Sequence, residues 1–165
     1  MDVIYLDNAA TSWPKPPEVG AAMARFLERD AGNPGRGGHR MARAAGDVVE
    51  RVRIKLAQRV GARDSRRLIM THGCTDAVNM AIHGVVRAAQ RCPKTSNPHV
   101  VTTVTEHNAV LRTLGCHAKS GDIDLDIVSC DEVGYIDPAR FLDACRPSTV
   151  LACVTHASNV LGTIQ

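Results

Sequence analysis

A glycine followed by a cysteine and a threonine, where an apolar run gives way to helical spacing, could bind a phosphate group. These residues are Gly73, Cys74 and Thr75, and residues 67–71 form the apolar run. The first amides of a helix have no intrahelical partner and lie at the positive end of its dipole, so they suit an anion. We expect Gly73 to allow a tight strand-to-helix corner. A simple N-cap without a ligand would explain the same pattern.

His107 follows a β-branched run at residues 100–105 and is a second candidate for chemistry. An imidazole there could stack on an aromatic ligand or transfer a proton near neutral pH. A helix-capping or surface histidine would produce the same pattern, and the chain has seven histidines. The residue alone does not decide between these interpretations.

Cys74 permits a different chemistry. A cysteine at a helix N-terminus has its thiolate stabilised. With His107 as base and Asn159 as the orienting group, it would form a Cys-His-Asn hydrolase site. Cys74 could equally be a small residue that leaves space beside a phosphate. Metal binding is disfavoured, because pairs such as His72 and Cys74 do not have the spacing of zinc ligands.

Alternating strand and helix patterns are expected to position these residues. Helical spacing or composition is present at residues 18–30, 40–60, 75–91, 108–118 and 138–144, and β-branched runs at 67–71, 99–105, 125–129 and 149–155. Such alternation predicts an α/β fold with a largely parallel sheet and right-handed crossovers. Ligands gather at the carboxyl ends of parallel strands. We therefore expect residues 73–75, 106–108 and 156–159 to meet at one sheet edge.

Composition limits the class of protein. The 165 residues are 44% apolar and 22% charged, with a net charge of +3, which suits one globular domain. The cations are spread along the chain, which does not favour a nucleic-acid partner. No apolar stretch reaches the roughly 18 to 20 residues that cross a bilayer, and no signal peptide is evident. Six cysteines without zinc spacing indicate a reducing compartment. We expect a cytoplasmic protein without a membrane partner.

Several motifs occur together along the chain: YLDNAATSWPKPPEV ending at Val19, GNPGRGGH at 32–39, THGCTDAVN at 71–79, TEHNAV at 105–110 and HASNVLGTIQ at 156–165. In this order and spacing they resemble the amino-terminal part of the cysteine desulfurases. These are class V aminotransferases and pyridoxal-phosphate (PLP) enzymes of fold type I. The resemblance covers essentially the whole chain.

The resemblance implies a three-layer α/β fold with a mainly parallel sheet, of the fold type I kind, which this chain supplies only in part. Residues 1–15 would form an N-terminal arm or small-domain segment. Residues 16–165 would form an incomplete N-terminal part of the large PLP-binding domain.

The resemblance also implies roles for individual residues. Gly73, Cys74 and Thr75 would hold the cofactor phosphate, although alanine is the commoner family residue at position 74. His107 would stack on the pyridine ring and assist proton transfers, and Asn159 would reach the ring hydroxyl or the substrate carboxylate. The substrate entrance would be lined by Asn8, Ala9, Ala10 and Thr11.

The family reaction removes sulfur from L-cysteine, giving alanine and an enzyme persulfide. The family enzymes are homodimers. The resemblance therefore also implies a sulfur-acceptor protein as partner and a role in sulfur metabolism such as iron–sulfur cluster assembly. The family's Schiff-base lysine and nucleophilic cysteine lie in motifs downstream of residue 165, so this chain is expected to be inactive alone. Two alternatives stay open at this point. One is a non-catalytic phosphate-ligand binder or partner subunit, and the other is the hydrolase that uses Cys74, His107 and Asn159.

Overall fold

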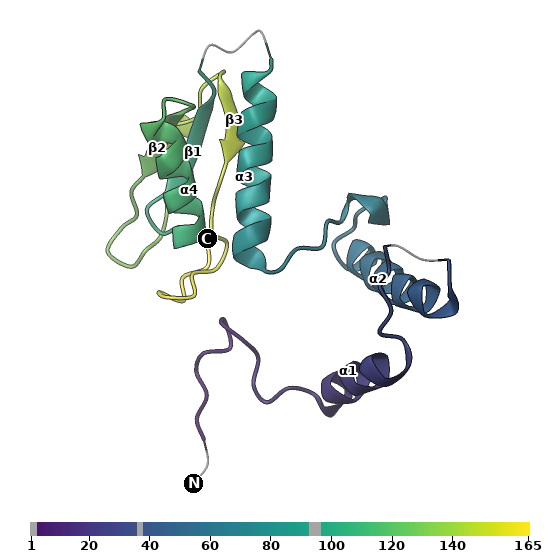
Figure 1. Ribbon diagram of the computed structural model, residues 1–165. Helices are drawn as coiled ribbons and strands as arrows, with labels where there is room; N and C mark the ends of the chain where they lie inside the picture. The colour runs from purple at the N-terminus through teal and green to yellow at the C-terminus, as the bar shows by residue number, and fades with distance from the viewer. Residues whose placement is uncertain (1–2, 36–37, 93–96) are drawn as a thin grey trace. The chain divides into compact units, whose positions relative to one another are not determined.

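The computed structural model describes residues 3–35, 38–92 and 97–165 of the chain (Figure 1). They form two compact units, Met1–Met70 and Thr71–Gln165. Residues 36 and 37 of the GNPGRGGH motif lie outside the described ranges. The expected boundary between an arm at 1–15 and a domain at 16–165 stays a prediction.

The first unit is helical. It contains helix α1 (Pro17–Arg29), helix α2 (Arg40–Arg59) and the 3-10 helix η1 (Ser65–Arg67). Proline in the first turn suits α1, because that position needs no amide hydrogen. His39 caps α2 by accepting a hydrogen bond at Nδ1 from the amide of Ala42, at 3.3 Å. Both predicted helices of this unit are therefore present.

Gly32 lies where the loop before α2 passes close to that helix. A Cβ atom at this position would lie 2.6 Å from the carbonyl carbon of Met41, closer than real Cβ contacts allow. Glycine is required here by packing within the unit. Phosphate binding by this loop stays a prediction.

The second unit is built on a parallel sheet. Its strands are β1 (His99–Thr103), β2 (Asp124–Val128) and β3 (Thr149–Ala152), and its helices are α3 (Cys74–Gln90), α4 (Asn108–Lys119) and α5 (Pro138–Asp143). The strand order is β2-β1-β3, and β1 pairs in parallel with both neighbours. This arrangement confirms the predicted α/β class, with the sheet present in part.

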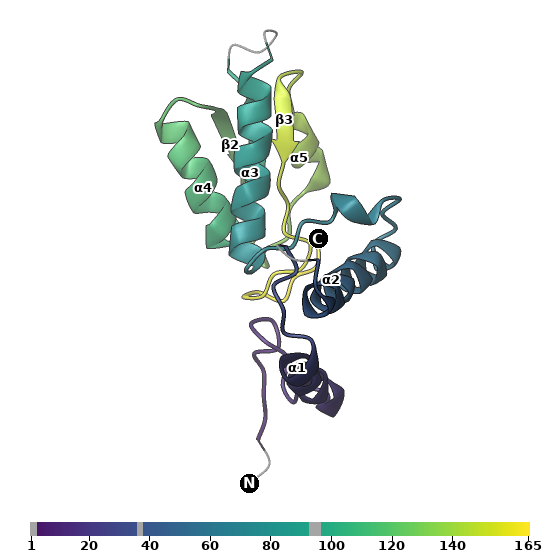
Figure 2. The same cartoon turned by 45° about the vertical axis from the view of Figure 1, so that its right-hand side comes forward.

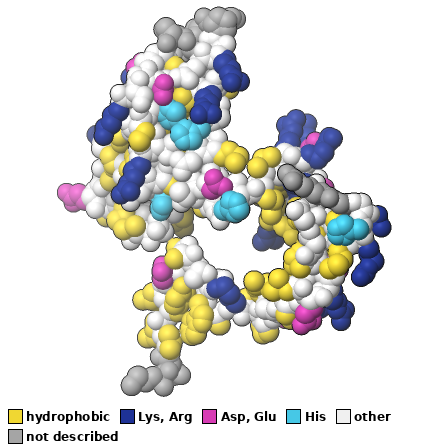
Figure 3. Space-filling model, viewed as in Figure 1, with side chains coloured by type: hydrophobic (Ala, Val, Ile, Leu, Met, Phe, Trp, Pro, Cys, Tyr) yellow, Lys and Arg dark blue, Asp and Glu magenta, His cyan; other side chains and the backbone are white. Residues whose placement is uncertain are grey.

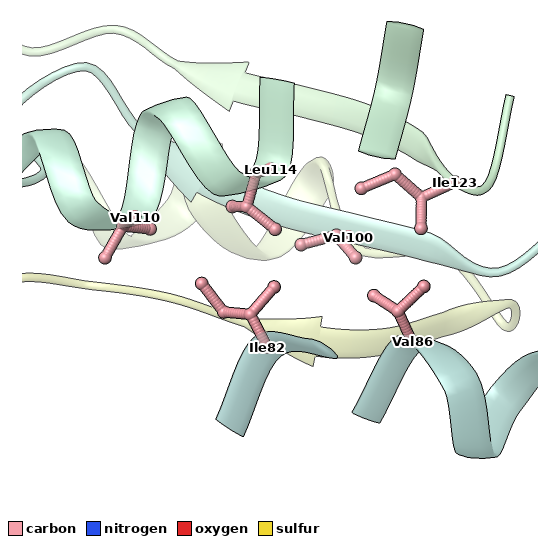
Figure 4. Close-up of a cluster of buried hydrophobic side chains, with 6 residues drawn as sticks. All are labelled: Ile82, Val86, Val100, Val110, Leu114 and Ile123. Atoms are coloured by element: carbon pink, nitrogen blue, oxygen red, sulfur yellow. The ribbon is translucent and has the colours of Figure 1, made fainter. Parts of the chain in front are cut away.

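Helices cover both faces of this sheet, because successive residues of β1 point in opposite directions. Val100 joins the core beneath α3 and α4 (Figure 4), whose other buried members are Ile82, Val86, Val110, Leu114 and Ile123. Val101 instead packs with Val128 and Ile136, and Phe141 of α5 lies against that cluster. Figure 2 shows α3 and α4 side by side, with α5 behind β3. The result is the predicted three-layer arrangement.

His99 links the three strands at the start of β1. Its side chain is fully buried, with Nδ1 2.7 Å from Oγ1 of Thr149 and Nε2 3.4 Å from Oδ2 of Asp126. The carboxylate of Asp126 also accepts a hydrogen bond of 2.7 Å from Nη2 of Arg146. These contacts join β1 to β2, β3 and the turn before β3.

The predicted strand at residues 67–71 is wrong. The 3-10 helix η1 ends at Arg67, and residues 68–71 are irregular. A β-branched or apolar run becomes a strand only beside a hydrogen-bonding neighbour, and no described strand pairs with this segment. The carbonyl of Leu68 instead accepts a hydrogen bond of 3.1 Å from Nε of Arg53. The segment therefore leads into α3 without being a sheet strand.

The distribution of charged side chains on the surface agrees with the spread of Lys and Arg along the sequence. In Figure 3, Lys and Arg side chains lie at several places over the visible face of the second unit and do not form one continuous patch. In the described residues, no helix has the length and apolarity that a membrane crossing requires. The same residues contain no disulfide and no cluster of three metal-ligating side chains.

Candidate functional site

The start of α3 leaves three backbone amides without an acceptor in the described part of the chain. The first helical hydrogen bond runs from the amide of Ala77 to the carbonyl of Gly73, at 3.0 Å. The amides of Cys74, Thr75 and Asp76 precede it and donate to no described group. We call these amides, together with the Thr75 hydroxyl, the phosphate cup. Such an arrangement attracts an anion.

Gly73 serves the phosphate cup by lacking a side chain. Its φ of 163° is extended backbone that any residue adopts, and an added Cβ would meet nothing within 4 Å. The expected use of Gly73, to take backbone angles that other residues avoid at this corner, is therefore not what the structure shows. A Ser, Thr or Asp at this N-cap position would itself bond the helix amides. Glycine offers no such group, so the amides stay available for a ligand.

Thr75 of the phosphate cup and His107 meet in one hollow between the N-terminal parts of α3 and α4. We call it the α3–α4 cavity. Its volume is about 270 Å³, and it is lined by Thr75, Asn79, His107, Asn108, Ala109, Arg112 and Thr113. The predicted neighbours Thr75 and His107 are thus brought together. Arg112 adds a cation that forms no ion pair within the described part of the chain, which suits a negatively charged ligand.

His107 and Asn159 meet in a second hollow at the carboxyl ends of the strands. This strand-end cavity has a volume of about 560 Å³, within the range of small-molecule sites. It is lined by Val104, Thr105, Glu106, His107, Asn108, Cys130, Ser158, Asn159, Val160 and Leu161. His107 and Asn108 line both cavities, so these residues connect the cavity of Thr75 with that of Asn159. Of the three segments expected to meet at one sheet edge, the two that follow β1 and β3, residues 106–108 and 156–159, therefore line the same cavity.

His107 has a structural role that also fixes its protonation pattern. It is the N-cap of α4, and its Nδ1 accepts a hydrogen bond of 3.0 Å from the amide of Ala109. An acceptor nitrogen carries no hydrogen, so in the neutral ring the hydrogen is on Nε2. The capping interpretation is thus correct for Nδ1, and Nε2 remains for a ligand.

Asn159 lies in a tight turn that lines the strand-end cavity. Oγ of Ser158 accepts hydrogen bonds from the amides of Val160 and Leu161, at 3.3 and 3.0 Å. The amide of Ser158 donates to the carbonyl of Thr163, at 2.9 Å. The side-chain amide of Asn159 has no partner among the described residues and is exposed. It can therefore bond a ligand in the cavity.

Glu106 lines the strand-end cavity, as expected for residues 106–108, but the sequence predicted no role for its carboxylate. Its Oε1 is buried and has no hydrogen-bond partner among the described residues. Burial, and then the charge of Glu106, raise the pKa of the Cys153 thiol at the end of β3. An unpaired buried oxygen is costly, so this site favours a ligand that donates a hydrogen bond. Glu106 is adjacent to His107 in sequence, which was the available signal.

Asn79, Arg112 and Cys130 were also missed. Asn79 and Arg112 lie one turn beyond Thr75 and Asn108, on the same helix faces, so helical spacing could have indicated them. Cys130 follows β2 directly and lines the strand-end cavity. The rule that ligands gather after parallel strands applies to it as well.

Cys74 does not join His107 in the structure. It is exposed at the first position of α3, lines neither of the two cavities, and makes no hydrogen bond with the imidazole in the described chain. The hydrolase alternative therefore gains no support from the geometry.

The predicted entrance residues Asn8, Ala9, Ala10 and Thr11 lie in the first unit and are exposed. Oδ1 of Asn8 accepts a hydrogen bond of 3.1 Å from the amide of Trp13, and Oγ1 of Thr11 accepts one of 3.0 Å from Nζ of Lys15. Local contacts thus fold this segment on itself. Its role as a substrate entrance stays a prediction.

Comparison with known proteins agrees with these features. The family model of the class V aminotransferases matches residues 4–165. The chain belongs to the class V aminotransferases. Among curated proteins, it is 37% identical over 164 residues to a cysteine desulfurase IscS of Haemophilus influenzae, covering 98% of this chain and 39% of the relative. It is 37% identical over 162 residues to the IscS of Dictyoglomus turgidum, with the same coverage.

Several solved structures share the fold of this chain. A NifS-like protein matches with a TM-score of 0.88 and 26% identity, covering 98% of this chain and 42% of that one. A structure described as SspA in complex with cysteine gives a TM-score of 0.85 and 28% identity, covering 98% and 44%. DndA from Streptomyces lividans gives 0.81 and 30%, covering 94% and 42%. The chain therefore spans about two-fifths of the length of these relatives.

The family's enzymes depend on PLP, which confirms the predicted cofactor class. The described residues fit that group. The free amides and hydroxyl of the phosphate cup suit a phosphate, and the ring of His107 borders the same cavity. The amide of Asn159 and the unpaired oxygen of Glu106 supply polar partners across the strand-end cavity. Donors, ring and acceptor thus occur together in one unit.

Proposed function

We propose that this chain forms the N-terminal part of a PLP-dependent cysteine desulfurase, which removes sulfur from L-cysteine. The observation that carries the proposal is the shared cavity of Thr75 and His107, with unpaired amides at the start of α3. The identity to curated cysteine desulfurases supports the reaction.

Different residues of the site would bind different parts of the cofactor. The phosphate cup would bind the phosphate through its amides and the Thr75 hydroxyl. His107 would stack on the ring. When bound, PLP supplies an electron sink for a developing carbanion. Because Nδ1 of His107 is held by the amide of Ala109, proton transfer would use Nε2. In the neutral ring this nitrogen carries hydrogen, so its first step would be donation.

The two residues across the strand-end cavity would orient the ligands. The side-chain amide of Asn159 would donate a hydrogen bond to the ring oxygen or the substrate carboxylate. The unpaired Oε1 of Glu106 would accept one from a bound donor. The entrance at Asn8–Thr11 remains part of this proposal.

The relatives support the proposed substrate, and the partners are part of the proposal. The relatives are cysteine desulfurases, and one similar structure is described with cysteine, which supports L-cysteine as substrate. We further infer a homodimer in the cytoplasm that passes sulfur to an acceptor protein, as in iron–sulfur cluster assembly. Neither cavity is lined by a lysine in the described residues. Residues 1–165 alone are therefore proposed to bind the cofactor without turnover.

The test is cofactor binding and turnover by the purified full-length protein. We expect PLP to bind, and L-cysteine in the presence of excess thiol reductant, which releases the persulfide sulfur, to yield equal amounts of alanine and sulfide. The Thr75→Val variant removes the hydroxyl at constant shape and should weaken PLP binding by about ten- to a hundredfold, since a hydrogen bond to a charged group is worth about 1.5–3 kcal/mol. Thr75→Ser should restore it. Unchanged affinity in Thr75→Val would contradict the site. Binding without turnover would instead favour the non-catalytic binder or partner subunit.

A further inference from the structure

We propose that Asn79 and Thr113 form a brace that fixes the distance between the phosphate cup and His107. Their hydrogen bonds connect α3 to α4 inside the α3–α4 cavity. The inference rests on the proposed cofactor site and names two positioning residues for it. Neither side chain needs to touch the cofactor for the brace to act.

Asn79 uses both ends of its side-chain amide. Nδ2 donates a hydrogen bond of 2.8 Å to the carbonyl of Thr75, which belongs to the first turn of α3. Oδ1 accepts a hydrogen bond from the hydroxyl of Thr113 on the neighbouring helix. One side chain thus binds the turn that carries the phosphate cup and the helix that begins after His107.

The connection continues along α4 to the imidazole. Oγ1 of Thr113 lies 2.8 Å from the carbonyl of Ala109, and its single hydrogen is shared between this oxygen and Asn79. The amide of the same Ala109 donates to Nδ1 of His107, at 3.0 Å. The Thr113 side chain is 8% exposed, and little exposure to water strengthens such hydrogen bonds. An unbroken path therefore leads from the Thr75 carbonyl to the His107 ring.

A brace of this kind matters for a ligand that binds at both ends of it. A phosphate alone needs the cup, and a pyridine alone needs the imidazole. A molecule that carries both gains from the second contact only when the two sites are held at the correct separation. Loss of the brace should therefore weaken the joined ligand and leave its two halves unaffected.

Three probes separate these cases in the full-length protein. Pyridoxine 5′-phosphate carries ring and phosphate but lacks the aldehyde, so it binds without a covalent bond. Pyridoxine and inorganic phosphate are its two halves. In Asn79→Leu and Thr113→Val, which remove the hydrogen bonds at nearly constant shape, we expect pyridoxine 5′-phosphate to bind about tenfold more weakly, as expected for about 1.4 kcal/mol. The dissociation constants of the two halves should change less than about twofold.

Matched variants control for general damage. Thr113→Ser keeps the hydroxyl and should restore binding. Val86→Ala removes core volume from α3 away from the cup, so it should lower unfolding stability without changing the three dissociation constants. The double variant Asn79→Leu with Thr113→Val should lose no more affinity than either single variant, because both changes break one connection.

Three outcomes would overturn the brace: equal weakening of all three probes, additive losses in the double variant, or unchanged binding of pyridoxine 5′-phosphate. A different result would show that the proposed cofactor site itself is wrong. In that case the wild-type protein would bind pyridoxine 5′-phosphate no more tightly than pyridoxine, and Thr75→Val would change nothing.

Discussion

Nδ1 of His107 accepts a hydrogen bond of 3.0 Å from the backbone amide of Ala109, so one imidazole both caps helix α4 and borders the two cavities. The cap directs Nε2, with its hydrogen, away from the helix end. Stability and ligand binding are therefore two separable properties of this residue.

Substitution of His107 should separate these properties. His107→Ala removes the cap and should lower the free energy of unfolding by about 1 kcal/mol, whereas His107→Asn supplies a good capping side chain and should leave it nearly unchanged. Both variants lack the ring and should weaken PLP binding. Urea unfolding and cofactor titration measure the two effects. Equal stability losses in both variants would contradict the capping role.

Most of the fold could be predicted from the sequence, because local patterns determine it. Residues 40–60 carry an apolar face at helical spacing, and α2 matches them within one residue. The strand predicted at residues 67–71 is absent, because a strand forms only beside a hydrogen-bonding neighbour, which the sequence does not reveal. Strand ends were also overestimated, since β1 stops at Thr103 and its predicted run extends to 105.

The sequence predicted those site residues that belong to recognisable motifs. It did not predict residues whose role depends on a contact between two helices. Thr75, His107 and Asn159 were named from motifs, and the structure puts each of them at a cavity. Asn79 and Thr113 were not named, because their hydrogen bond joins residues 34 positions apart. One of the two reasons for naming Gly73, its freedom to take unusual backbone angles, does not apply, since its observed angle is open to any residue.

The core beneath α3 and α4 should be sensitive to lost volume. Leu114 is fully buried among Ile82, Val86 and Val100 (Figure 4). Leu114→Ala should lower the free energy of unfolding by about 2–5 kcal/mol, because it removes buried methyl groups and leaves a cavity. As a control, Leu142→Ala at a side chain that is 68% exposed should change it by less than about 0.5 kcal/mol. Chemical denaturation compares the two, and a small effect at Leu114 would refute this core assignment.

Asp126 should make stability depend on acid. The hydrogen bond from Arg146, and the charges of Arg146 and His99, hold the pKa of this carboxyl below its usual value of 3.8. A depressed pKa stabilises the folded state above the unfolded pKa, and the effect is lost as the pH falls through the lower folded value. Stability should therefore decline below about pH 4, and Asp126→Asn should show a shallower decline.

The measurement is the midpoint of urea unfolding between pH 2 and pH 7, a span set to bracket ordinary aspartate pKa values of about 3.9. Asp143→Asn is the matched control, because Asp143 is exposed and has no ion pair in the described residues. An identical acid profile for Asp126→Asn and the wild type would exclude this contribution.

Cys153 should react slowly with alkylating reagents, and Glu106 should be part of the cause. Burial first, and then the Glu106 charge, raise the pKa of this thiol, so little thiolate is present at neutral pH. Glu106→Gln removes the charge and should increase the alkylation rate of Cys153, while Glu132→Gln at an exposed acid should not. Peptide mapping by mass spectrometry after timed iodoacetamide treatment measures each cysteine separately. An unchanged Cys153 rate would show that the carboxylate does not act on the thiol.

Rapid, stoichiometric labelling of Cys74 at mildly acidic pH in the same maps would support the hydrolase alternative, because only an activated thiolate reacts there.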